Sequence, residues 1–125
     1  MALYGFENVI AWQKAHVFVL SVYRLTKSFP KEELFGLTSQ FRRAAVSIEA
    51  NIVEGYKKLS KADKLRFLNI SQASLEECRN YIILSRDLEY IDEENINTLY
   101  QQIEQASWFL NKYCKGIIEN NGIKG

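Results

Sequence analysis

Apolar residues recur every three or four positions along the last third of the chain, the spacing of one face of a long helix. This stripe consists of Ile96, Leu99, Ile103, Ala106, Leu110, Tyr113 and Ile117. Three earlier segments have helical spacing too, so we expect helices over about residues 9–28, 37–57, 61–88 and 93–116, and a frayed tail over 120–125. The segments between these helices are short, and helices joined by short connections pack as antiparallel neighbours. The sequence therefore predicts an all-α fold: one up-down-up-down antiparallel four-helix bundle over residues 1–125.

Local signals place the helix ends. Pro30 ends the first helix, Ser60 with Asp63 begins the third in the manner of a capping box, and Asp92 begins the fourth. Gly116 is expected to fray.

The third segment has small residues at the centre of its inward arc, which indicates a close helix contact. These residues are Ser71, Ser74, Cys78 and Ser85; the larger flanking residues are Leu68, Leu75 and Ile82 on one side and Ile70, Tyr81 and Leu88 on the other. Ala44, Ala45 and Gly55 give the second helix a similar surface. The second and third helices are therefore expected to approach closely.

Composition limits the classes of function. Charged residues make up 25% of the chain, yet the net charge is only +1, so any site for a polyanion must be local. The N-terminus does not read as a signal peptide, and no apolar run approaches the ~18 residues that span a bilayer. Cys78 and Cys114 fit reduced core residues. A cytoplasmic protein without a membrane partner is expected.

A polar stripe runs along the segment from Gln40 to Gly55. Arg43, Ser47, Asn51 and Glu54 fall within about 80° of one another on a helix. The stripe is open to three interpretations: a solvated face, a hydrogen-bonded network between protomers, or a ligand or catalytic site. The network is favoured, because no nucleophile with a base accompanies the stripe.

A second apolar strip lies beside the polar stripe. It consists of Val46, Ala50 and Val53, and a helix that is apolar on two sides needs a second partner surface. Isolated surface valines are the alternative. The predicted homo-oligomer interface comprises Arg43, Val46, Ser47, Ala50, Asn51, Val53 and Glu54.

A run of cations follows this segment. Lys57, Lys58, Lys61, Lys64 and Arg66 share residues 56–66 with one acid, Asp63. Together they would form a positive surface that follows a phosphate backbone, with Tyr56 and Phe67 available for stacking. An ordinary solvated turn is the alternative interpretation, and the sequence leaves both open.

The opposite end of the bundle is expected to be acidic. Between Glu76 and Glu94, seven acids accompany two arginines. The protomer is therefore expected to be polar along its long axis. An acidic end would suit a basic protein partner.

Catalytic and metal-binding motifs are missing from the sequence. His16 is the only histidine, which argues against a histidine-based metal site or a nucleophile–histidine pair. The Glu-x-x-His spacing of di-iron bundles and a glycine-rich phosphate loop are also absent. We expect no enzyme, no cofactor and no metal, and we expect Trp12 and Trp108 to be core or interface anchors.

Three motifs in order carry a family resemblance. They are AWQKA followed by Tyr23 and Leu25, then FPKEELFGLTSQFRRAAVSIEANIVEG, then RFLNISQASLEECRNYIILSRDLEYI. With these motifs the chain resembles, from Phe6 to about Ile118, the four-helix-bundle proteins encoded in intervening sequences of bacterial 23S ribosomal RNA genes. It departs from them at the small cluster Ser71–Ser74 and at Glu49, where the family often has proline.

The resemblance implies a closed homo-oligomer, a pentameric ring of bundles, without established enzymatic activity. A related group, the accessory variability determinants of diversity-generating retroelements, binds nucleic acid and a reverse transcriptase through such a ring. Repeated around a ring, the basic cluster would form a positive rim, and it predicts binding of RNA or other nucleic acid such as DNA, RNA first. The alternative is a protein-interaction scaffold, with a partner such as a reverse transcriptase.

Overall fold

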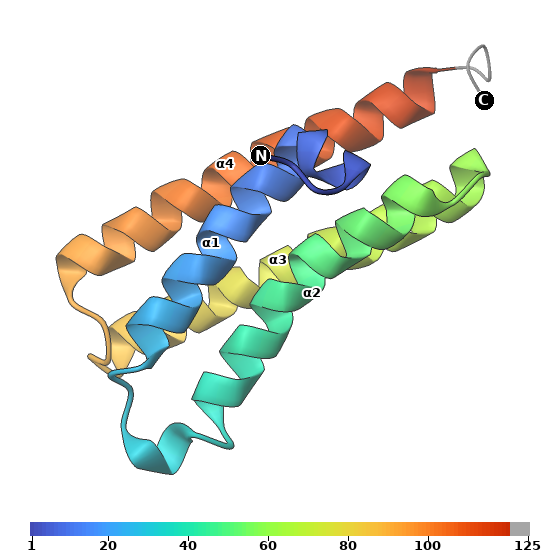
Figure 1. Cartoon of the computed structure of the whole chain (residues 1–125). Coiled ribbons are helices and arrows are strands. Elements are labelled where there is room, and N and C mark those ends of the chain that lie inside the picture. The colour runs from blue at the N-terminus through green and yellow to red at the C-terminus, as the bar shows by residue number, and fades with distance from the viewer. Residues whose placement is uncertain (121–125) are drawn as a thin grey trace.

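Four α-helices make up most of the computed structural model, which describes residues 1–120 (Figure 1). They are α1 (Ile10–Thr26), α2 (Leu37–Lys57), α3 (Lys61–Asp87) and α4 (Glu93–Glu119). Short 3₁₀ helices, Gly5–Asn8 and Lys31–Glu33, precede α1 and α2. None of the helices described over residues 1–120 is long and apolar enough to cross a membrane.

The helix ends differ from expectation at two places. α1 ends at Thr26, short of the expected residue 28, and α4 continues through Gly116 to Glu119. The expectation that Gly116 frays is wrong, because buried Cys114 and half-buried Ile117 keep this turn packed on the bundle. Of the expected tail over 120–125, Asn120 is the C-cap of α4, and residues 121–125 lie outside the described residues.

Each α-helix packs against two others. α1 contacts α2 and α4, and α3 likewise contacts α2 and α4, so the four helices close into a ring of contacts (Figure 1). Successive helices run in opposite directions. The predicted four-helix bundle is confirmed.

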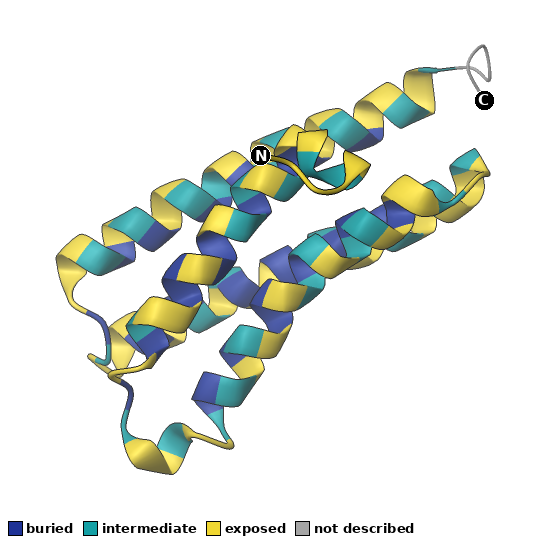
Figure 2. Ribbon diagram, viewed as in Figure 1, coloured by how far each residue is buried: buried dark blue, intermediate teal, exposed yellow. Residues whose placement is uncertain are grey.

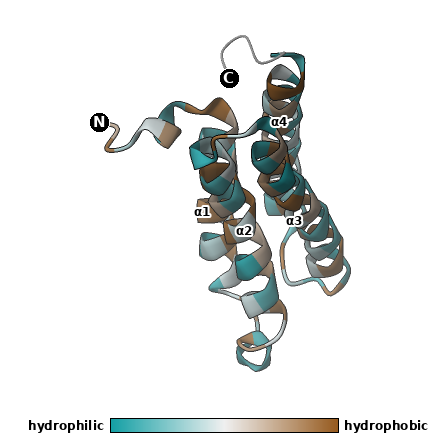
Figure 3. Ribbon diagram, turned by 90° about the vertical axis from the view of Figure 1, so that its right-hand side faces the viewer, coloured by the Kyte–Doolittle hydropathy of each residue, from teal (hydrophilic) through white to brown (hydrophobic). Residues whose placement is uncertain are grey.

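The core receives large side chains from all four helices, and buried residues face the inside of the bundle (Figure 2). Phe18, Phe41, Ile48, Leu68 and Leu99 are each at most 1% exposed. Hydrophobic and hydrophilic residues alternate along each helix, and the N-terminal segment projects to one side of the bundle (Figure 3). This alternation follows from the apolar residues that recur every three or four positions in the sequence.

α2 and α3 approach each other closely through small residues. A Cβ atom at Gly55 would lie 3.1 Å from Leu68 Cγ and 3.1 Å from the Lys64 carbonyl oxygen. Ser71 is fully buried, and its Oγ donates to the carbonyl oxygen of Ile48 at 2.7 Å. The predicted contact of small residues is confirmed.

The prediction that large residues flank both sides of the small surface of α3 is wrong at two positions. Ile70 is 41% exposed and Leu88 is 44% exposed, whereas Leu68, Leu75 and Ile82 are buried. On this flank only Tyr81 is half-buried, so the packed surface of α3 is narrower than its apolar residues suggest.

Side-chain caps begin α3 and α4 at the expected residues. Ser60 Oγ accepts a hydrogen bond from the Asp63 amide at 3.1 Å, and Asp92 Oδ1 accepts one from the Asn95 amide at 3.0 Å. These bonds satisfy backbone donors that the first helical turn leaves unpaired. Both start signals are confirmed.

α2 begins differently, because its N-cap residue, Gly36, has no side chain. Glu33 takes this role from the preceding 3₁₀ helix. Its Oε1 accepts from the Leu37 amide at 3.1 Å, and its Oε2 accepts from the Tyr90 hydroxyl at 2.9 Å. One carboxylate therefore joins the start of α2 to the α3–α4 turn.

α3 ends in a Schellman motif whose left-handed residue is not glycine. The Tyr90 amide donates to the Ser85 carbonyl at 2.9 Å, and the Glu89 amide donates to the Arg86 carbonyl at 3.0 Å. Glu89 has a φ of 59°. This backbone region is costly for a residue with a Cβ atom.

Candidate nucleic-acid interface and assembly surface

The five cations of the predicted basic cluster meet at one end of the bundle. α2 ends and α3 begins there, and the C-terminal end of α4 lies at the same end (Figure 1). Lys57 and Arg66 are exposed, whereas Lys58, Lys61 and Lys64 are half-buried. We call this set of five residues the basic turn.

Two lysines of the basic turn bind backbone carbonyls at helix ends. Lys64 Nζ donates to the carbonyl oxygens of Tyr56 at 2.9 Å and Gly55 at 3.3 Å, in the last turn of α2. Lys61 Nζ donates to the Ile118 carbonyl at 3.0 Å, in the last turn of α4. A cation at this position satisfies unpaired carbonyls and complements the negative end of the helix dipole.

Two other cations lie over an aromatic ring. Lys58 Nζ is 4.9 Å from the ring centroid of Phe67, and Arg66 Cζ is 4.6 Å from it. Their acidic neighbours are more distant than a hydrogen bond, since Glu54 is 3.8 Å from Lys58 and Asp63 is 3.8 Å from Arg66. The sequence indicated Phe67 as a stacking residue but not as a ring that holds cations. The contact from Lys58 depends on the α2–α3 turn, whereas Arg66 adjoins Phe67 in α3.

Tyr56, the other residue expected to stack, lies against the N-terminal segment. A Cβ atom at Gly5 would be 2.5 Å from the Tyr56 hydroxyl oxygen, and the side chain is 39% exposed. The ring therefore has a neighbour in the chain itself.

The end opposite the basic turn is not uniformly acidic, so the expectation of an acidic end is wrong. The α3–α4 turn shares this end with the α1–α2 connection (Figure 1), as the bond between Tyr90 and Glu33 shows. The α1–α2 connection and its flanking turns bring Arg24, Lys27, Lys31, Arg42 and Arg43. The charge difference along the bundle is smaller than the sequence suggested, because two connections of opposite charge meet.

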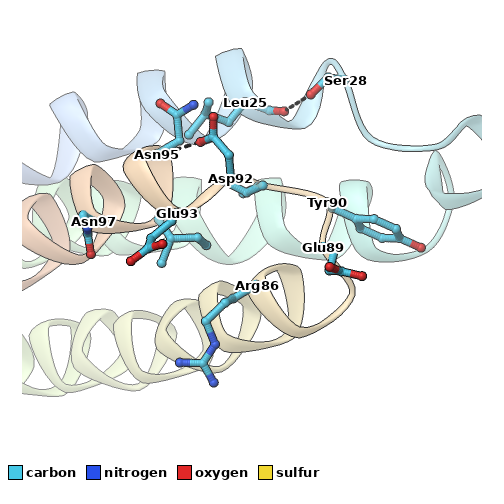
Figure 4. Close-up of a pocket in the computed structure, with 11 residues that line it drawn as sticks. Leu25, Ser28, Arg86, Glu89, Tyr90, Asp92, Glu93, Asn95 and Asn97 are labelled. Carbon is cyan, nitrogen blue, oxygen red and sulfur yellow. Dashed lines mark hydrogen bonds between the residues drawn. The ribbon is translucent and has the colours of Figure 1, made fainter.

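The acidic residues of this end line an open hollow of about 820 Å³ (Figure 4). Its lining includes Glu89, Asp92 and Glu93 from the α3–α4 turn and the start of α4, and Leu25 and Ser28 from the end of α1. Asp92 already caps α4 with one carboxylate oxygen. The hollow is polar, with Arg86 as its cation.

The polar stripe of α2 divides between the bundle and the surface. Ser47 Oγ lies 2.7 Å from Ser74 Oγ of α3, and Asn51 Nδ2 donates to Ser47 Oγ at 3.0 Å. Arg43 and Glu54 are exposed. At least part of the hydrogen-bonding capacity of Ser47 and Asn51 is therefore used within the protomer.

The outer surface of α2 is hollowed into a groove of about 770 Å³. Five of the seven predicted interface residues line it, namely Arg43, Val46, Ser47, Ala50 and Asn51. Val53 is half-buried and Glu54 exposed, and both lie outside the groove lining.

The groove also contains apolar residues outside the predicted interface. Leu34 and Phe35, between the second 3₁₀ helix and α2, are 52% and 92% exposed, and Tyr23 of α1 also lines the groove. Because they lie in a loop, the helical spacing of apolar residues gives no indication of them. Two consecutive large apolar residues in a short connection were the available signal.

His16 contacts Glu49, the residue that departs from the family pattern. His16 Nδ1 lies 2.8 Å from Glu49 Oε2, and the imidazole stacks on Trp12 with ring centroids 4.7 Å apart. Trp12 is half-buried, whereas Trp108 is 58% exposed and carries Lys112 over its ring at 5.0 Å. Trp108 is therefore not a core residue.

The two cysteines are buried and unpaired. Burial raises the pKa of both the Cys78 and the Cys114 thiol, so each stays protonated and is a poor nucleophile. Within residues 1–120, no group of three or more His, Cys, Asp or Glu side chains is placed to hold a metal ion.

Comparison with known proteins supports the resemblance seen in the sequence. No curated protein matches the chain. A crystal structure of a protein of unknown function, from the S23 ribosomal protein family of Bacteroides thetaiotaomicron VPI-5482, is similar with a TM-score of 0.77 and 23% identity. The match covers 85% of this chain and 96% of that chain and shows a shared fold. The family model described as "23S rRNA-intervening sequence protein" matches residues 7–112, so the chain belongs to the 23S rRNA-intervening sequence protein family.

Proposed function

We propose that this protein is a non-enzymatic homo-oligomer that binds RNA or other nucleic acid through the basic turn. The observation that carries this proposal is the local excess of positive charge. Residues 54–66 and 112–119 lie at one end of the bundle and hold seven lysines and arginines against three acids. Such an excess attracts a phosphate backbone without regard to sequence.

The test is the salt dependence of RNA binding by the full chain. A fluorescent RNA hairpin is titrated with protein between 50 and 200 mM salt, and the logarithm of the binding constant should fall steeply with the logarithm of salt. The variant Lys57→Glu/Lys58→Glu should weaken binding and flatten this slope.

The matched control reverses two cations at the other end of the bundle. Arg24→Glu/Lys27→Glu makes the same change in net charge, away from the basic turn. It should bind like the parent. Equal loss in both variants, or no binding by the parent, would contradict the proposal.

The groove on α2 is the proposed assembly surface, with the pentameric ring implied by the family resemblance as the assembly. Its exposed apolar residues, above all Phe35, favour burial against another copy. Val46→Arg would place a charge in that contact and should yield monomers in size-exclusion chromatography with light scattering. Val17→Arg, at a valine of α1 that is 49% exposed, is the control. A monomeric parent would refute the assembly.

A protein-interaction scaffold is the second candidate function. The acidic hollow at the α3–α4 turn favours it, because Glu89, Asp92 and Glu93 would suit a basic protein surface. A partner such as a reverse transcriptase should then be recovered with the tagged protein from nuclease-treated extract. Glu93→Lys/Glu94→Lys should lose that partner, and retention of RNA binding by this variant would separate the two functions.

A further inference from the structure

The five cations of the basic turn differ in what already neutralises them. Lys61 and Lys64 donate to three main-chain carbonyls at distances of 2.9 to 3.3 Å. Their ammonium groups compensate the C-terminal ends of α4 and α2. A phosphate that approached these two lysines would compete with bonds that hold the helix ends together.

Lys58 and Arg66 are in another situation. Their acidic partners, Glu54 and Asp63, are more than half exposed and 3.8 Å away, and such surface pairs are weak. Phe67 lies under both cations and attracts them through its ring quadrupole without using their hydrogen-bond donors. Both groups therefore keep donors for an anion.

Lys57 completes the second group. It is exposed, and its ammonium group forms no hydrogen bond or ion pair with any residue of the described chain, 1–120. It is the last residue of α2 and adjoins Lys58. Three cations of the basic turn thus have donors available.

The aromatic ring within the basic turn is already occupied by cations. Lys58 and Arg66 both lie over the Phe67 ring, at 4.9 and 4.6 Å from its centroid. Unpaired bases bind proteins largely by stacking on such rings. Here the Phe67 ring holds two cations instead, which favours contact with the phosphate backbone of a duplex.

We propose that Lys57, Lys58 and Arg66 bind the phosphate backbone of duplex RNA, with Phe67 as the positioning residue, and that Lys61 and Lys64 are structural caps. This inference rests on the proposed function and divides its residues into two roles. It predicts that duplex RNA binds at least as tightly as an unpaired strand of equal length.

The experiment compares two variants that remove equal charge from the same turn. Binding of a fluorescent 20-base-pair RNA duplex to the full chain is measured by anisotropy over 50–250 mM salt. Lys58→Gln/Arg66→Gln should reduce the salt slope by roughly 1 to 2. Lys61→Gln/Lys64→Gln should leave the slope unchanged and lower the midpoint of thermal unfolding. If that double variant unfolds, single Lys61→Gln is compared with single Lys58→Gln.

A separate pair of variants tests whether the Phe67 ring positions the cations or only packs against its neighbours. Phe67→Leu keeps an apolar side chain and all cations but removes the ring, and should weaken duplex binding roughly threefold to tenfold. Phe67→Tyr, which restores a ring, should recover it. Loss in Phe67→Leu without recovery in Phe67→Tyr would overturn the positioning role.

The remaining outcomes separate this inference from the proposed function. Equal slope changes in the two double variants would overturn the division of roles while RNA binding stands. Tighter binding of 20-nucleotide poly(U) than of the duplex would overturn backbone recognition alone. A parent protein that binds neither RNA would overturn both proposals.

Discussion

The two ends of the bundle carry nearly the same number of cations but very different numbers of acids. Residues 54–66 and 112–119, at the basic turn, hold seven cations and three acids. Residues 24–43 and 86–94, at the other end, hold six cations and seven acids. The difference arises because a second connection balances the charge of the first at one end only. A charge run in sequence becomes a charged surface only where the neighbouring connection does not offset it.

The ends also differ in how their helices are joined. At the basic turn, α2 and α3 are separated by three residues, and two lysines of α3 bind the free carbonyls of α2 and α4. At the other end, a Schellman motif and the Glu33 carboxylate provide the connections. Lysines at the first end therefore stabilise the fold as well as contribute charge.

The largest expected effect concerns the close approach of α2 and α3 at the basic turn. Gly55→Leu has no room, since a Cβ atom alone would lie 3.1 Å from both Leu68 and the Lys64 carbonyl. The substitution should lower the free energy of unfolding by about 1–3 kcal/mol, measured by urea denaturation.

Gly116→Leu is the control for this prediction. A Cβ atom at Gly116 would meet no neighbour within 4 Å, and leucine favours helix over glycine. This variant should be as stable as the parent or more so. Equal destabilisation by both substitutions would show that the loss at Gly55 does not come from the close approach of α2 and α3.

The second prediction concerns Glu89, the residue with a left-handed backbone conformation at the end opposite the basic turn. Glu89→Gly should raise the free energy of unfolding by about 1 kcal/mol, because glycine adopts a φ of 59° without steric cost. Glu89→Ala removes the same charge but keeps the Cβ atom. It should give no such gain, and equal stabilisation by alanine would assign the effect to charge instead. Thermal unfolding of the three proteins makes the comparison.

The sequence predicted the helices well because their apolar spacing is long and regular. The stripe from Ile96 to Leu110 is buried, and Ser60 and Asp92 cap the helices they were expected to begin. These features depend on residues within one or two turns of each other. Local chemistry is enough to predict them.

The features that the sequence missed depend on contacts between elements. The bond from Lys61 to Ile118 joins residues that are 57 positions apart, and the bond from Tyr90 to Glu33 spans the same separation. The mixed charge of the second end has the same origin. Likewise, Glu89 has the left-handed conformation that usually selects glycine, so the Schellman motif left no composition signal.

The smallest expected effect concerns the hydrogen bond from the Tyr90 hydroxyl to Glu33, which links the α3–α4 turn to the α1–α2 connection. The hydrogen bond to Glu33 raises the pKa of Tyr90 above its ordinary value of 10.0, because ionisation would remove the donor and place two negative groups together. The folded chain therefore holds this proton more tightly than the unfolded chain does. The resulting stabilisation is complete below the unfolded pKa and is lost as the pH rises through the folded pKa.

Tyr90→Phe removes the hydroxyl, so it should unfold at a slightly lower temperature than the parent at pH 8. The difference between the two unfolding midpoints should shrink above about pH 10, where the parent loses the bond and the variant has nothing to lose. Other groups that titrate at alkaline pH affect both proteins alike and cancel in the difference. A difference in unfolding midpoint that stays constant from pH 8 to pH 11 would show that the packing of the Tyr90 ring, rather than the hydrogen bond from its hydroxyl to Glu33, stabilises the contact between the α3–α4 turn and the α1–α2 connection.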